Sequence, residues 1–307
     1  MIRQSAFENN RKLLKGELHC HTTRSDGQGD PADVIRMYKE HGFDFLALTD
    51  HRRYNYENFA PETEITIIPG MEMDRNLPGP GVHCHHIVCV GPQKDQGNGF
   101  EQDQYFDSAR IETAAECQEM LDWIHAANNL TVYCHPEWSG VSAREFEELE
   151  GNFAMEIWNS GCAIEDGVDT NAAYWDELLI QGKKIYGVAT DDGHAMYQHC
   201  NGWVCVNAEN NVSDILEALK SGAFYASCGP EIYDFRIEDG KAIVECSPVK
   251  EIQFRHFRVP YKHTVAAEGE TVTTASVNVR EGTGYIRATM VDEQGRRAWT
   301  NPIFLGE

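Results

Sequence analysis

Short apolar runs that stop at histidine or carboxylate residues recur through the N-terminal part of the chain. Buried parallel strands read as such continuous apolar runs. In barrels of alternating strands and helices, the carboxyl ends of the strands converge on one mouth, where catalytic residues lie. The runs FDFLALT, EITIIPG, LTVYC and KKIYGVAT lead, respectively, to Asp50 and His51, to Glu72, to His135, and to Asp191, Asp192 and His194. The pattern therefore predicts an α/β protein that gathers polar side chains at one mouth.

The stretch GELHCHTTRSDG supplies a further pair of histidines ahead of these runs. In an extended strand successive side chains point to opposite faces, so His19 and His21 can reach one cation while Cys20 points away. Two histidines on a strand can equally hydrogen-bond to neighbours or solvent, so this motif alone is not specific. Together with the strand ends, it predicts a metallohydrolase.

Helix start and stop signals lie between the apolar runs, as the crossovers of a parallel barrel require. Asp30 is a good N-cap, Pro31 suits the first helical position, and Gly42 can end the helix. Further helices are expected over about residues 108–128, from Ser142 with Glu145 in a capping box, over 170–181 and over 213–221. This alternation predicts a TIM-like barrel of seven or eight strands, with helices between most of them, in residues 1–223.

The residue pattern changes after Phe224, where runs rich in β-forming residues, such as EIQFRHFRV and YIRATMV, are separated by turn signals. Such a series of short strands predicts a small, all-β, sandwich-like domain in residues 224–307. This region contains His256 and His263, and neither follows the strand-end pattern. We expect both to be ordinary surface or packing residues.

The composition of the chain limits which partners the protein can bind and in which cellular compartment we expect it. A formal net charge of −23 argues against an extended nucleic-acid surface, because such binding needs many Lys and Arg side chains on phosphates. The N-terminal segment lacks an apolar leader core, and no run approaches the ~20 apolar residues of a membrane span. The ten cysteines are scattered singly, which fits a reducing compartment. We expect a cytoplasmic protein that acts on a small molecule and does not enter a membrane.

Five motifs, taken in order, resemble the signature motifs of the PHP (polymerase and histidinol phosphatase) superfamily. They are HCHTTRSDG, LTDH, IPGMEMD, CHP and DDGH, and the resemblance extends from Lys15 to Val206. The segments SGAFYASCGPEI and RRAWTNPIFL further resemble the branch that includes carbaryl hydrolase, whose members append a β domain. The resemblance implies a distorted (β/α)7 barrel with a two- or three-metal site at the strand ends.

Carried over to this chain, the resemblance implies a set of metal ligands. A first metal would be bound by His19, His21, Glu72 and Asp192, a second by Glu72, His86 and His135, and a third by Asp26, His51 and His194. Family members often have His at the position of Asp26, which leaves two or three metals open. His86 is preferred over His83 and His85 because family members place a ligand directly before the apolar run. The D-x-H spacing of Asp192 and His194 leaves Asp191 as a structural carboxylate.

The ligand types suggest the chemistry. Nitrogen and oxygen ligands without thiolates suit Zn, Mn or Fe. Two cations that share Glu72, with Asp192 and His194 beside them, would supply an activated hydroxide for hydrolysis. No covalent nucleophile is needed, so Cys20, Cys84 and Cys134 are expected only to pack.

Several other polar residues could reach the same mouth. Arg24, Arg52 and Arg53 could recognise a phosphate, since arginine suits bidentate phosphate binding, or could form salt bridges or lie in solvated loops. Glu156 and Asn159, in the run AMEIWNS, could act there or hydrogen-bond to the ligands.

These observations predict a metal-dependent phosphoesterase that acts on a small phosphorylated molecule or a nucleotide end. A hydrolase of carbamates or carboxylic esters is the main alternative, because of the tail that resembles the carbaryl hydrolase branch. A metal-binding scaffold without catalysis is a second alternative, and the complete ligand set argues against it.

Overall fold

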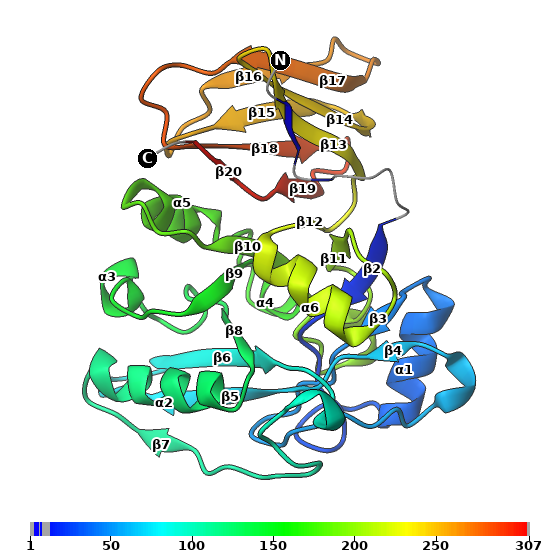
Figure 1. The fold of residues 1–307 in the computed structure, drawn as a ribbon, viewed down its shortest axis with the longest axis vertical. Coiled ribbons are helices and arrows are strands. Elements are labelled where there is room, and N and C mark those ends of the chain that lie inside the picture. The colour runs from blue at the N-terminus through cyan, green and yellow to red at the C-terminus, as the bar shows by residue number, and fades with distance from the viewer. Residues whose placement is uncertain (1–2, 6, 8–12, 306–307) are drawn as a thin grey trace.

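The computed structural model describes residues 3–5, 7 and 13–305, and Figure 1 shows a mixed helix and strand part stacked against a strand-rich part. The sequence predicts no leader in the N-terminal segment. Residues 1–2, 6 and 8–12 of that segment lie outside the described residues. In the part of the chain that the structure describes, no helix has the length and apolar character needed to cross a membrane.

The described α-helices largely follow the predicted start and stop signals. Asp30 accepts a hydrogen bond from the backbone N–H of Ala32, and Ser142 and Glu145 form the predicted capping box. The helix expected from about residue 108 begins later, because Thr113 accepts from the N–H of Glu116 and is its N-cap. The helices are α1 (Pro31–Glu40), α2 (Ala114–Ala126), α3 (Ala143–Phe146), α4 (Ser160–Glu165), α5 (Ala172–Ile180) and α6 (Val212–Ser221).

One sheet of the mixed part has the strand order β10-β9-β8-β6-β5-β7. Its strands are β5 (Gly70–Asn76), β6 (Cys84–Val90), β7 (Ala109–Arg110), β8 (Leu130–Tyr133), β9 (Asn152–Asn159) and β10 (Tyr186–Thr190). β8, β9 and β10 are parallel, but β6 is antiparallel to both β5 and β8. The expectation of parallel strands throughout is wrong at β6, because the chain between Asn76 and Cys84 is too short for a helical crossover.

A second sheet continues from the mixed part into the C-terminal part, in the order β16-β15-β18-β19-β12-β11-β2-β3-β4, with β20 paired to β18. In the mixed part its strands are β2 (Leu14–Glu17), β3 (Phe45–Leu46), β4 (Thr66–Ile67) and β11 (Trp203–Val206). β11 is antiparallel to β2, which is a second departure from the expected parallel barrel. A closed barrel is not confirmed, since the strand pairs of the described residues fall into separate sheets.

The two sheets nevertheless enclose one apolar interior. Phe45, Val88, Val132, Val188 and Val204 belong to a single buried cluster although they come from strands of both sheets. Isolated bridges from Cys20 to Gly193 and from His51 to Glu72 join the sheets at one end of this cluster. The strand ends that carry histidines and carboxylates therefore meet at one place.

The C-terminal part is all β, as the alternating runs predict, and its two layers enclose a core that includes Phe235, Val244 and Phe254. One layer is the sheet β1-β13-β14-β17, and the other is the C-terminal half of the second sheet. The strands are β1 (Arg3–Ser5), β12 (Phe224–Ser227), β13 (Ile232–Glu238), β14 (Lys241–Val249), β15 (Glu251–Arg255), β16 (Lys262–Val265), β17 (Val272–Asn278), β18 (Tyr285–Val291), β19 (Arg297–Thr300) and β20 (Ile303–Phe304).

The predicted domain boundary at residue 224 falls within a continuous sheet. β12 pairs with β11 on one side and with β19 on the other, so hydrogen bonds run across the boundary. The division into residues 1–223 and 224–307 stays a prediction. Of the two C-terminal histidines, His263 pairs with Glu251 at 2.9 Å at the surface, and His256 contacts the ring of Tyr261.

Candidate metal centre

Three groups of histidine and carboxylate side chains lie next to one another, and adjacent groups share a residue. Within each group the candidate ligand atoms lie within 4.8 Å of one another. The groups are His19, His21, Glu72 and Asp192; Glu72, His86 and His135; and His21, Asp26, His51 and His194. The structure thus brings together every residue that the sequence analysis assigned as a ligand.

The central group is compact enough for one small cation. Nε2 of His21 lies 3.0 Å from Oδ1 of Asp192 and 3.3 Å from Oε2 of Glu72. Nε2 of His19 lies 3.2 Å from Oδ1 of Asp192 and 3.4 Å from Oε1 of Glu72. Ligands that bind one zinc ion tetrahedrally, at about 2.0–2.1 Å, lie roughly 3.3 Å from one another. The observed separations match that spacing.

Unpartnered buried atoms also fit a cation. Oε2 of Glu72 and Nδ1 of His51 are buried, and neither has a hydrogen-bond partner among the described residues, although they lie only 2.9 Å apart. Buried polar atoms are normally satisfied by a hydrogen bond, a water molecule or an ion. A divalent cation between these atoms would satisfy both, so the residues present fit a metal.

The second group is built on adjacent strands. Nδ1 of His86 lies 2.8 Å from Oε1 of Glu72, and Nε2 of His135 lies 3.4 Å from the same oxygen. Along β6 the preceding residue, His85, points the other way and its Nδ1 lies 2.7 Å from the hydroxyl of Tyr133. His83 pairs with Glu145 instead. Alternation along the strand therefore places His86, of the three histidines, beside Glu72.

Glu72 differs from the expected strand-end position. It is the third residue of β5 and is completely buried, so it reaches the site from within a strand. Its carboxylate touches all three groups through His19, His86 and His51. This central placement makes Glu72 the residue best positioned to bridge two cations.

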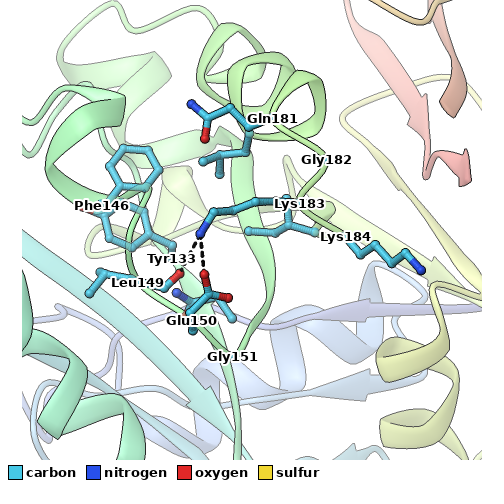
Figure 2. A pocket seen from close by; sticks show the side chains of 12 residues that line it. Tyr133, Phe146, Leu149, Glu150, Gly151, Gln181, Gly182, Lys183 and Lys184 are labelled. Atoms are coloured by element: carbon cyan, nitrogen blue, oxygen red, sulfur yellow. Dashed lines mark hydrogen bonds and ion pairs between the residues drawn. The ribbon is translucent and has the colours of Figure 1, made fainter. Parts of the chain in front are cut away.

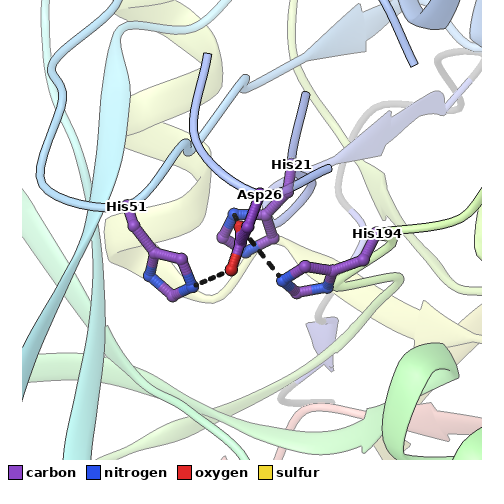
Figure 3. A group of neighbouring side chains, drawn as sticks. All are labelled: His21, Asp26, His51 and His194. Atoms are coloured by element: carbon purple, nitrogen blue, oxygen red, sulfur yellow. Dashed lines mark ion pairs between the residues drawn. The ribbon is translucent and has the colours of Figure 1, made fainter. Parts of the chain in front are cut away.

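The third group is more exposed than the other two. Figure 3 shows the carboxylate of Asp26 between the imidazoles of His21, His51 and His194. Its oxygens lie 3.4 Å from Nε2 of His51 and 3.4 Å from Nε2 of His194. The Asp26 side chain is 55% exposed, which makes this position the most accessible to solvent.

Glu156 of β9 contacts His19 and the backbone of His135, next to the central group. Its Oε1 lies 2.6 Å from Nδ1 of His19, and its Oε2 accepts hydrogen bonds from the backbone N–H of His135 and from the amide of Asn159. A fourth group of His19, Cys134 and Glu156 lies here. Burial raises the pKa of the Cys134 thiol well above its usual value, so this thiol stays protonated and packs, as expected.

Asp191 has the structural role that the sequence analysis proposed for it. Its carboxylate accepts hydrogen bonds from the hydroxyl of Tyr38 and from the backbone N–H groups of Cys200, Asn201 and Gly202. Burial raises the pKa of Asp191 to about 6 despite these donors. The network fixes the segment that carries Asp192 and His194.

The backbone is strained at two of the predicted ligands. Asp192 has a φ of 47° and His135 has a φ of 25°, both in the left-handed region. Such conformations are unfavourable for residues other than glycine and cluster at functional sites. Each lies two residues after the end of a strand, His135 after β8 and Asp192 after β10.

The histidines and carboxylates of the cluster shift one another's pKa values. Burial disfavours the charged form of His19, but the carboxylates of Asp192 and Glu72 outweigh this and raise its pKa well above the usual value. Burial opposes ionisation of Glu72 too, yet His19, His51 and His86 hold its pKa well below the usual range. Positive charge is therefore strongly favoured around this carboxylate, and a bound cation would supply it.

The three arginines predicted to bind substrate have different surroundings. Arg24 pairs with Asp103 and donates to Asn55, and Arg52 pairs with Asp74. Nε of Arg53 is buried and has no hydrogen-bond partner among the described residues. The salt-bridge alternative thus describes Arg24 and Arg52, whereas Arg53 has a buried donor without a partner among the described residues.

Two residues that the sequence analysis did not assign lie against the second group. The ring of Trp138 lies 5.0 Å from that of His135 and 5.7 Å from that of His86, measured between centroids. The hydroxyl of Ser139 lies 3.1 Å from Nδ1 of His135. In the sequence they lie two and three residues after the CHP motif.

A cavity of about 410 Å³ lies away from this cluster, at the N-terminal ends of β9 and β10 (Figure 2). Lys183 and Glu150 both line it and pair with each other at 2.8 Å. None of the predicted ligands lines the cavity. The predicted metal ligands therefore lie away from this cavity, towards the carboxyl ends of these strands.

Comparisons with known proteins agree with this picture. Residues 17–159 match the model of the PHP domain family, a span that includes all predicted ligands except Asp192 and His194. A 5'-3' exoribonuclease from Haemophilus influenzae is 37% identical over 73 residues, which cover 22% of this chain. The matched part spans only 27% of that enzyme's length.

A solved structure resembles the whole fold. It is a two-domain protein from Bacteroides vulgatus that contains a predicted PHP-like metal-dependent phosphoesterase. The likeness has a TM-score of 0.50 at 14% identity and covers 97% of each chain, so it concerns the fold alone. The comparisons do not support the resemblance of the tail to the carbaryl hydrolase branch. By these comparisons, residues 17–159 of this chain are similar to the PHP domain family.

Proposed function

We propose that this protein is a metal-dependent phosphoesterase that hydrolyses a small phosphorylated molecule or a nucleotide end. The observation that carries the proposal is the sharing of residues between adjacent groups, with Glu72 and His21 each belonging to two of them. Shared ligands are the arrangement that holds cations close enough to act together on one phosphoryl group. The PHP domain match and the partial match to an exoribonuclease support the same chemistry.

The residues would hold two or three divalent cations. His19, His21, Glu72 and Asp192 would hold the first, Glu72 with His86 and His135 the second, and Asp26, His51 and His194 the third. Imidazole and carboxylate ligands suit Zn, Mn or Fe. When bound, such cations polarise a phosphoryl oxygen and lower the pKa of a water molecule towards neutrality.

The protein's own hydrogen bonds prepare these ligands. Glu156, 2.6 Å away, would hold a proton on Nδ1 of His19, which would leave the lone pair of Nε2 for a cation. Ser139 can hold the Nδ1 proton of His135 in the same way. Partners of this kind fix the tautomer and orientation of a ligating imidazole. Arg53, which follows His51 by two residues in the chain, would contact the phosphate of the substrate.

Hydrolysis of a carbamate or carboxylic ester is the alternative for the same centre. It rests on the resemblance of the C-terminal segments to the carbaryl hydrolase branch. A scaffold without catalysis is a weaker alternative, since every predicted ligand is present and placed in the cluster.

The test is elemental analysis of protein purified without added metal, combined with hydrolysis assays on a phosphomonoester, a phosphodiester and a carbamate. The variant is Glu72→Ala, and Glu251→Ala, which removes a surface carboxylate paired with His263, is the matched control. We expect at least two metals per chain and phosphate release that only Glu72→Ala abolishes. Turnover of the carbamate alone would favour the alternative hydrolase, and protein without bound metal would contradict the proposal.

A further inference from the structure

A cleft lined by four arginines lies between α5 and the strands β15, β18 and β19 of the C-terminal part. Its volume is about 310 Å³, near the lower end of small-molecule sites. None of the predicted metal ligands lines it. The residues that matter here are Arg255, Arg258, Arg287, Arg297, Asp176 and Thr289.

The charge of this cleft is opposite to that of the protein. The whole chain has 49 acidic against 26 basic residues and a net charge of −23. The lining of the cleft has four guanidinium groups and one carboxylate, that of Asp176. The four guanidinium groups also outnumber the three carboxylates that they pair with, which are Asp176 and, outside the lining, Glu177 and Asp169.

Arg287 forms a fixed floor for the cleft. Its side chain is 1% exposed, and its Nε and Nη2 donate to Oδ1 of Asp176. Nη1 donates to the hydroxyl of Thr289, and the guanidinium lies 4.5 Å from the ring centroid of Trp175. Arg255 approaches the other oxygen of Asp176 at 3.5 Å. These contacts hold two guanidinium groups in place before any ligand binds.

The two rim arginines are held more loosely. Arg258 is 60% exposed and donates through Nη2 to Glu177, and Arg297 donates through Nη1 to Asp169 at 2.6 Å. Neither Glu177 nor Asp169 lines the cleft. Because a guanidinium group has five N–H donors, each rim arginine keeps donors that can turn to a ligand.

We propose that this cleft binds a small doubly charged oxyanion, a phosphate group that is either free or carried by a small monoester. The paired N–H donors of a guanidinium group match the spacing of two phosphate oxygens, so arginine binds phosphate bidentately. Four guanidinium groups against the three carboxylates that pair with them leave an excess of positive charge, and their several N–H donors suit the oxygens of a phosphate group. The cleft joins α5 to the C-terminal strands, so a bound anion would also tie the two parts of the protein together.

The test is calorimetric titration of inorganic phosphate and of glycerol phosphate into the full chain in the Glu72→Ala background, which removes the carboxylate shared by two groups of the metal centre. Arg258→Gln and Arg297→Gln probe the rim, and neither side chain is buried, so the fold should be retained. The matched control is Arg296→Gln, an exposed arginine paired with one carboxylate, Asp292, outside the cleft.

We expect one phosphate site per chain, with affinity lowered about tenfold or more by either rim variant and unchanged by the control. Tighter binding of glycerol phosphate identifies a monoester as the ligand, and tighter binding of inorganic phosphate identifies the free anion. Rim variants that lower the melting temperature without changing phosphate affinity would show that the arginines only join the two parts, and would overturn the proposal. Absence of binding in the Glu72→Ala background would overturn it too.

Discussion

Nδ1 of His19 lies 2.6 Å from Oε1 of Glu156, and both side chains are completely buried. The other nitrogen of the same ring faces Asp192 and Glu72. Glu156 is therefore a positioning residue, because the proton it holds decides which nitrogen is available to a cation.

Glu156→Gln is expected to weaken metal binding by about 10–100-fold, as loss of such partners does in other metal sites. The amide keeps the size of the side chain but removes the charge that orients His19. Metal affinity is measured by competition with a chromophoric chelator. Glu150→Gln, which changes a surface carboxylate paired with Lys183, is the control. Equal affinities for all three proteins would contradict the orienting role.

Removal of metal is expected to lower the melting temperature. The carboxylates of Glu72 and Asp192 are crowded against several imidazoles in a buried site, and a cation bound only by the folded state stabilises it by mass action. At free metal about 100-fold above the Kd, that stabilisation amounts to about 2.7 kcal/mol. Thermal melts with EDTA, and after metal is added back, measure it. An unchanged melting temperature would argue that the cluster binds no cation.

Acid is expected to destabilise the fold through His199. Burial lowers the pKa of His199 from 6.5 to about 4, so between these values the unfolded chain binds a proton that the folded chain does not. The folded pKa is depressed, so this part of the stability is present above pH 6.5 and is lost as the pH falls towards 4. Urea unfolding of wild type and His199→Asn across this window measures it. The slope should be shallower in the variant and unchanged in His41→Asn, at an exposed position.

Arg53→Ala is expected to raise KM for a phosphate ester about tenfold with a smaller effect on kcat, since Arg53 would contact the substrate phosphate in the ground state. Steady-state kinetics on the metal-loaded enzyme tests this. Arg36→Ala removes an exposed arginine of α1 that pairs with Asp33 and Glu62 and is the control. A variant with unaltered KM would leave Arg53 without a role in binding.

Local patterns predicted most of the candidate site. His135 directly follows an apolar run, Asp192 follows one after a single residue, and the two-residue alternation of β6 separates His86 from His85. Capping residues also predicted the starts of α1 and α3. Each of these features depends on residues a few positions apart, for which backbone geometry sets the relative direction of side chains.

The start of α2 shows a limit of such patterns. The expected helix included residues 109–110, which form β7 instead, paired in parallel with β5. That pairing depends on residues distant in sequence. Similarly, no motif marks Trp138, which is recognisable only by the two imidazoles it contacts.

The sequence by itself determined which side chains can bind a cation and on which face of a strand each one lies, because strand and helix periods are local properties of the backbone. Only the tertiary structure decided that β6 and β11 run antiparallel, that one sheet continues through β12 into the C-terminal part, and that Arg287 meets Asp176 in the arginine-lined cleft. These contacts join residues far apart in the chain, and they depend on how whole sheets pack around a common core, which no short-range pattern specifies.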